Sequence, residues 1–232
     1  MKGAYEMFPL GLQLSHRALL RNLDQFARLV PGAGGLVLNR SDGPQTLSRE
    51  RVAEYIVWYG DFLDVHHRGE DEHIFPALRK HTHGRTTDVA HLDTWKREHD
   101  AIYQTSRELR SANAQLAQNT AGALDDVQRR AAELRHQLTP HLKAEEDVLT
   151  PAHLREMIPE HELERAQMAI ARSQGLGAVH MAQFFVHSLE PDEQRALLGG
   201  TPWFFRKLVL GALGARRTSR FGGLMPVRHV YV

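Results

Sequence analysis

The chain has 232 residues, of which 25% are charged and 42% hydrophobic, and its formal net charge is +1. These values are typical of a soluble globular protein, and the net charge gives no argument for binding to nucleic acid or to a membrane. Because the chain contains no cysteine, disulfides, zinc–thiolate sites, iron–sulfur clusters and cysteine nucleophiles are excluded.

Apolar residues recur at three- and four-residue steps along most of the chain, which indicates amphipathic helices. This pattern predicts four long helices: about 11–30, from Ser48 to near Pro76, about Asp88 to Asn113, and from after Gly122 to near Pro151. PGAGG (31–35) ends the first helix, and we expect a loop from there to about Thr46 because strand signals are nearly absent. Mostly short connections between such helices indicate an all-α, up-and-down four-helix bundle.

The rest of the chain predicts an additional helical C-terminal extension. Three helices are expected there: about His161 to Leu189, a short one after Glu190-Pro191, and an apolar one from Thr201-Pro202. The last stretch, RRTSRFGGLMPVRHVYV, is basic, and we expect it to be weakly structured. We therefore divide the chain into a bundle (1–157), a helical extension that packs on it (158–215) and a basic tail (216–232).

One short pattern occurs twice. Residues 66–78 read HHRGEDEHIFPAL, and residues 141–153 read HLKAEEDVLTPAH. Each copy begins with His, places Glu four residues later and reaches Pro-Ala at the same offset. Successive residues turn by about 100° on a helix, so the His and the Glu of each copy lie within about 40° of each other. Both pairs lie on the apolar stripe of their helix and therefore face the core.

Two further histidines, His16 and His99, lie centrally on the apolar stripes of the first and third helices. They precede the two paired motifs by similar distances, which indicates a repeated helix pair with pseudo-twofold symmetry. A buried Glu needs a partner, and imidazoles with carboxylates suit first-row transition metals, where one carboxylate can bridge two ions. The sequence thus predicts a metal site made of six residues: His16, His66, Glu70, His99, His141 and Glu145.

This order of His, His-x-x-x-Glu, His, His-x-x-x-Glu resembles the hemerythrin-like family, whose members carry an HHE cation-binding domain. The resemblance covers residues 11–155. It implies a non-heme centre of two iron ions, bound by the histidines, bridged by the two carboxylates and joined by an oxo or hydroxo group; a mixed manganese–iron pair is left open. Dioxygen, hydrogen peroxide or nitric oxide is then the small ligand at an open coordination position.

The chain departs from oxygen-carrying hemerythrins on the third helix. Those proteins have a second His one turn from the first, where this chain has Trp95 and Tyr103. Four His and two Glu leave at least one more open position, which favours redox turnover over oxygen storage. Tyr103, and Tyr59 two turns from His66, are candidate catalytic residues as proton or electron donors, with core packing as the alternative for both.

Two other histidines, His67 and His73, flank the motif of the second helix. His73 lies about 20° from His66 by the helical step, so it is an optional further ligand, and we place it behind the ligands or at the bundle edge. Pro140 precedes the fourth-helix motif and should kink that helix at the site.

The predicted function is a di-iron oxidoreductase that acts on peroxide or dioxygen, by catalase-like disproportionation or by oxidation of a small substrate. The alternative is a non-enzymatic protein that binds, senses or stores oxygen, nitric oxide or iron. A ferritin-like site is disfavoured, because residues 11–30 contain no Glu and His136 of Glu133-x-x-His136 points off the apolar stripe. We expect no nucleic-acid partner, no membrane span and no signal peptide, hence a cytoplasmic protein, and predict no oligomeric state.

Overall fold

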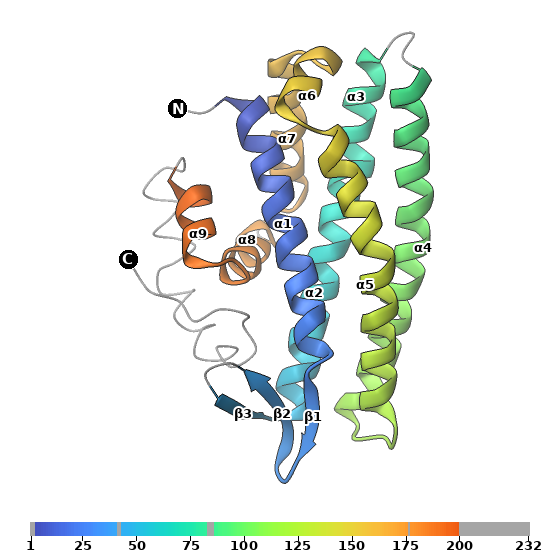
Figure 1. The fold of residues 1–232 in the computed structure, drawn as a ribbon, viewed down its shortest axis with the longest axis vertical. Coiled ribbons are helices and arrows are strands. Elements are labelled where there is room, and N and C mark those ends of the chain that lie inside the picture. Colours follow the sequence, from blue (N-terminus) through green and yellow to red (C-terminus); the bar gives the residue numbers. More distant parts are fainter. Residues whose placement is uncertain (1–2, 41–42, 83–85, 176, 200–232) are drawn as a thin grey trace.

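The structure is a computed structural model that describes residues 3–40, 43–82, 86–175 and 177–199. Its main body is an antiparallel bundle (Figure 1) of four long helices: α1 (Ala4–Phe26), α2 (Arg49–Gly69), α4 (Thr86–Ala117) and α5 (Ala123–Val148). The predicted up-and-down bundle is therefore confirmed. Ser48 caps α2 as expected, since its side chain accepts a hydrogen bond from the Arg51 backbone N–H. Within these described residues, no helix has the length and apolarity that a bilayer span requires.

A small antiparallel sheet stands where the sequence predicted a loop. Its three strands pair in the order β1 (Leu29–Gly32), β2 (Gly35–Arg40) and β3 (Gly43–Leu47). The strands bury four leucines in the bundle core: Leu29, Leu36, Leu38 and Leu47. The expected loop was wrong because the alternation in GLVLN is too short to stand out among helical patterns.

The second helix does not end near Pro76. After Gly69 it widens into a π-helical turn, η1 (Glu70–Ile74), and then continues as α3 (Phe75–His81). The Phe75 backbone N–H bonds to the Glu70 carbonyl, five residues back. Pro76 has no N–H to donate to the carbonyl four residues earlier, and it lies in the first turn of α3. Such π turns interrupt α-helices most often at functional sites, and this one begins at a predicted ligand.

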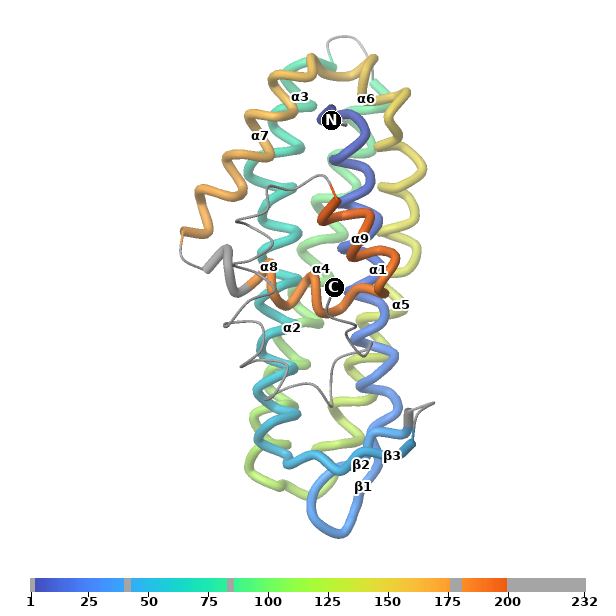
Figure 2. The backbone as a smooth tube through the Cα atoms, turned by 90° about the vertical axis from the view of Figure 1, so that its left-hand side faces the viewer, coloured from blue at the N-terminus to red at the C-terminus, as the bar shows by residue number. Residues whose placement is uncertain are grey.

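In the residues described between α5 and residue 199 the chain is helical, as predicted, but the helices are divided differently. It forms α6 (Pro151–Met157), α7 (Glu160–Ser173), α8 (Gly177–His187) and α9 (Pro191–Leu198). The expected helix through Leu189 is broken at Gly175, whose φ of 52° lies in the left-handed region. Figure 2 shows α8 and α9 lying across α1 and α2, where α8 contacts α2 and α9 contacts α1. The helix expected from Thr201 and the basic tail lie outside the described residues.

Two apolar clusters fill the bundle. One includes Leu14, Leu63, Ile102 and Leu138 and reaches the sheet. The other includes Leu12, Ile74, Trp95 and Leu149 and reaches α6 and α7. Along the sequence, each predicted ligand lies between a residue of one cluster and a residue of the other. In α4, for example, His99 lies between Trp95 and Ile102. The polar side chains thus form a layer in the middle of the bundle, between two apolar cores.

Candidate metal centre

Seven side chains in this middle layer form two adjoining groups. One group is His67, His99 and His141; the other is His16, His66, Glu70 and Glu145. In each group, one ligand nitrogen or oxygen of every residue lies within 4.8 Å of those of the others. The structure therefore brings together all six residues predicted as ligands, and it adds His67. We call the first group the three-imidazole site and the second the two-imidazole site.

The two carboxylates face both sites. Glu70 Oε1 lies 3.5 Å from His66 Nε2, whereas its Oε2 lies 3.7 Å from His99 Nε2. Glu145 repeats this arrangement, with Oε2 3.5 Å from His16 Nε2 and Oε1 3.7 Å from His99 Nε2. Each carboxylate thus offers one oxygen to each site, which is the arrangement that a carboxylate bridging two ions needs.

The inward-facing atoms are buried and lack hydrogen-bond partners among the residues that the structure describes. They are Nε2 of His16, His66 and His67 and both carboxylate oxygens of Glu70 and Glu145. The Nε2 atoms of His99 and His141 face each other at 3.0 Å. Leaving one buried polar group without a partner costs about 1–3 kcal/mol, more for a charged group. A set of imidazole nitrogens and carboxylate oxygens without partners fits cations bound between them.

Burial keeps the imidazoles neutral. It lowers the pKa of His16, and it moves the pKa values of His66 and His67 well below their usual range. For His141, burial and then the neighbouring imidazoles of His99 and His16 lower the pKa to about 3. A neutral imidazole has a free electron pair on one ring nitrogen, so these four side chains are in the protonation state that metal binding requires.

Burial raises the pKa values of the two carboxyl groups, whereas it lowers those of these four imidazoles. Burial and then the charge of Asp71 raise the pKa of Glu70 well above its usual range. Burial, followed by the charges of Glu70 and Glu98, likewise raises the pKa of Glu145. Without a cation these carboxyls therefore resist ionisation, and a nearby positive ion removes that cost.

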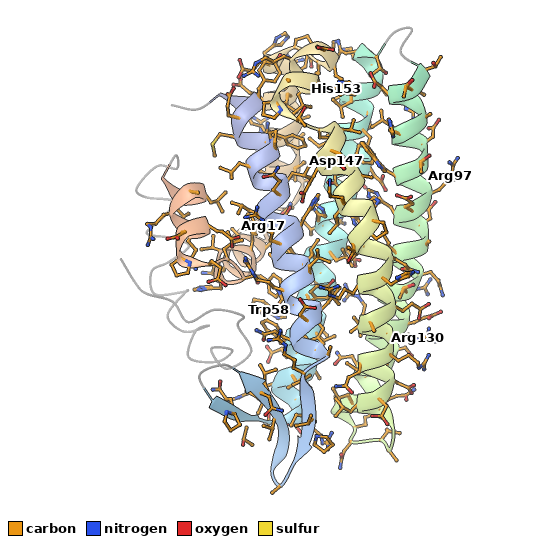
Figure 3. All side chains as sticks on the ribbon, in the orientation of Figure 1. Arg17, Trp58, Arg97, Arg130, Asp147 and His153 are labelled. Atoms are coloured by element: carbon orange, nitrogen blue, oxygen red, sulfur yellow. The ribbon has the colours of Figure 1, made fainter. Side chains whose placement is uncertain are left out.

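Three imidazoles form hydrogen bonds through Nδ1, the ring nitrogen that faces away from the centre, with carboxylates of other helices. The Nδ1 contacts are His16 to Glu146 at 2.9 Å, His99 to Asp71 at 3.0 Å and His141 to Glu98 at 2.8 Å. An Nδ1–H donated to a carboxylate leaves Nε2 free and directs it toward the middle of the bundle. We call Asp71, Glu98 and Glu146 the supporting carboxylates. Arg97, which precedes Glu98 on α4, points away from the bundle on its outer side (Figure 3), as the helical step requires.

His67 is the side chain in these groups that the sequence prediction did not include among the ligands. Its ring stacks on that of His99, with centroids 4.0 Å apart and planes at 15°, and lies 5.5 Å from the ring of His141. The second motif has Leu142 at the corresponding position, so the repeat gave no signal for this residue, and only the doubled His of HHRGE does. The structure thus offers five candidate imidazole donors instead of the four predicted from the sequence.

The two tyrosines lie outside both groups. Tyr59 is fully buried, and its ring packs edge-on against Phe26 at 5.4 Å. Its hydroxyl has no hydrogen-bond partner in the described part of the chain. Tyr103 is 53% exposed. It lines a pocket of about 470 Å³ between α2 and α4 whose walls include His67 and His99. Their roles as proton or electron donors stay predictions. His73 is partly buried and also lies outside the groups.

Comparison with known proteins supports the internal repeat. The family model for the hemerythrin HHE cation binding domain matches residues 11–152 and, a second time, residues 90–189. The first match spans the whole bundle with every residue of both sites. The second begins near the start of α4, the first helix of the second pair, as expected if the two pairs resemble each other. Searches of curated proteins and of solved structures found no match.

Proposed function

Because the chain belongs to the hemerythrin HHE cation-binding family, we propose that it holds two iron ions and acts as a redox enzyme on hydrogen peroxide or dioxygen. The observation that carries this proposal is the pair of buried carboxylates, each with one oxygen toward either site. Two iron ions supply the two-electron capacity that the reduction of these oxidants needs. The same nitrogen and oxygen donors also suit manganese in place of one iron.

The two sites differ in the number of protein donors. The three-imidazole site has three nitrogens and one oxygen from each carboxylate, whereas the two-imidazole site has two nitrogens and the other oxygens. A metal ion binds an exogenous molecule only where the protein leaves a position open. We therefore place the oxidant at the two-imidazole site, between His16 and His66.

The surroundings limit which molecules reach the centre. The apolar clusters on both sides of the polar layer exclude bulk water, which protects reactive species from side reactions. The pocket between α2 and α4 has His67 and His99 in its wall and so opens beside the three-imidazole site. Tyr103 on its wall is the residue we propose for electron or proton transfer with a donor in solution.

Reversible binding of dioxygen or nitric oxide without turnover is the second candidate function. His67 is the observation that favours it, because a fifth imidazole leaves fewer positions open at the centre. Storage needs a nearly saturated site with one vacancy, whereas turnover tolerates more.

One experiment separates these candidates. The full chain is purified in air, its iron content is measured, and its near-ultraviolet spectrum is followed as hydrogen peroxide is added. Bleaching of the bands with steady release of oxygen supports the enzyme. A spectral change under dioxygen that reverses on degassing, without oxygen release from peroxide, supports the binder. A protein without iron and without such bands contradicts both. Glu145→Gln, which replaces a carboxylate that faces both sites by a neutral amide with a single oxygen donor, is compared with Glu72→Gln on the exposed side of η1.

A further inference from the structure

Given the proposed two-ion centre, on which this inference rests, we propose that the ions bind in a fixed order and that the three-imidazole site fills first. The order follows because this site has a third imidazole, His67, and because Glu98 acts there as a positioning residue in addition to Asp71, so that these two carboxylates hold two imidazoles in place before any ion arrives. Their contacts are the Nδ1 hydrogen bonds from His99, at 3.0 Å, and from His141, at 2.8 Å.

Part of the supporting network obeys the pseudo-twofold symmetry of the bundle. Asp71 and Glu146 each follow a bridging Glu directly in the sequence. Asp71, from the first helix pair, supports His99 of the second pair, and Glu146, from the second pair, supports His16 of the first. Because each pair supports an imidazole of the other pair, each of the two sites has one supported imidazole.

The symmetry is broken at two positions, and both favour the same site. His67 contributes a third imidazole where the second pair has Leu142. Glu98, the residue before the α4 ligand, supports His141, but its counterpart before His16 is Ser15, whose hydroxyl donates to the Leu12 carbonyl of its own helix at 2.7 Å. The three-imidazole site therefore has two supported imidazoles and one more nitrogen than its neighbour.

These differences should give the three-imidazole site the higher affinity for a metal ion, because it has more donors and because more of them are already held in place. Removing a hydrogen-bond partner behind a metal-bound imidazole typically lowers metal affinity by about 10- to 100-fold. Asp71 is itself fixed, because Lys96 Nζ donates to its other oxygen at 3.3 Å. An imidazole held in this way needs no further ordering when the ion binds, which is the general advantage of a supported ligand.

Titration of the metal-free full chain with Co²⁺ tests the order. Each imidazole that binds through Nε2 keeps an exchangeable Nδ1–H, and the paramagnetic ion shifts its proton resonance. In the first equivalent we expect three such signals, from His67, His99 and His141, and in the second equivalent two more, from His16 and His66. Two signals in the first equivalent, or all signals growing together, would overturn the order. Failure of Co²⁺ to bind at all would instead contradict the two-ion centre itself.

Variants test the cause of the order. Glu98→Ala should weaken the first Co²⁺ step by about 10- to 100-fold and leave the second within about twofold, whereas Glu146→Ala should weaken only the second. Glu98→Gln, whose amide oxygen still accepts the Nδ1–H, should recover most of the first step. Glu72→Ala, an exposed neighbour of Asp71, is the matched control and should change neither step. If Glu98→Ala weakens both steps equally, or neither, while its circular dichroism equals that of the wild type, the positioning role is wrong.

Discussion

Replacing Glu70 by Gln should stabilise the metal-free protein near neutral pH and reduce the stabilisation that metal ions give. Within the described ranges neither Glu70 oxygen has a hydrogen-bond partner. Burial, followed by the charge of Asp71, raises the pKa of Glu70 well above the usual range. Without a cation, folding must therefore either protonate this carboxyl or bury its charge. Gln keeps the shape of the side chain and carries no charge, so the variant folds without that cost.

The expected gain in the free energy of unfolding depends on the pH. In the unfolded chain the carboxyl titrates near 4.5. Protonating it at pH 7 costs about 1.4 kcal/mol for each pH unit above that value, so Glu70→Gln should raise the free energy of unfolding by up to about 3 kcal/mol. An acid whose folded pKa is raised loses stability as pH rises above its unfolded value. The difference between variant and wild type should therefore shrink toward zero as pH falls from 7 to 4.5. Imidazoles with lowered pKa values titrate with the opposite sign in both proteins, so they largely cancel in this difference.

Urea unfolding in the presence of a chelator, followed by circular dichroism at pH 7, 6 and 5, measures this difference. Glu72→Gln is the control, since it removes an exposed acid two residues away and should change stability by less than about 0.5 kcal/mol. Equal stability of Glu70→Gln and wild type at pH 7, or a difference that does not change with pH, would refute the reasoning. Added Co²⁺ should raise the melting temperature of the wild type much more than that of Glu70→Gln.

Three further changes test the fold and the tyrosine. Asn22→Ala removes the acceptor of the Tyr55 hydroxyl hydrogen bond, at 2.6 Å, and a donor to Ser188 Oγ, at 3.1 Å, so urea unfolding should show a loss of about 2–3 kcal/mol. Gly175→Ala places a Cβ at a left-handed φ of 52° and should cost about 1 kcal/mol, seen as a lower melting temperature. Tyr103→Phe should leave the free energy of unfolding within about 0.5 kcal/mol because the side chain is exposed. It should lower peroxide turnover, and unchanged turnover removes Tyr103 from the mechanism.

The bundle was predictable because its helices are long and their apolar stripes follow one period over many turns. The inward-facing ligands were predictable for the same reason, since His-x-x-x-Glu occurs twice at one position on such a stripe. The sheet, the π turn and the break at Gly175 were missed because each depends on a few residues. None of these features gives a periodic signal in the sequence. They are an alternation over three residues, a widened turn before Pro76 and a single glycine.

His67 was not predicted as a ligand for a different reason. The proposed centre for two ions is wider than the apolar stripe of a single helix. On a helix, if His66 stands at 0°, Glu70 stands at about 40° and His67 at about 100°, so the carboxylate lies between the two imidazoles. Reading one narrow stripe pairs Glu70 with His66 and discards His67. In the structure Glu70 directs one oxygen toward the site of His66 and the other toward the site of His67 and His99. A bridging carboxylate on a helix therefore predicts a ligand on each side of it, and a doubled His before the Glu is the pattern that supplies both.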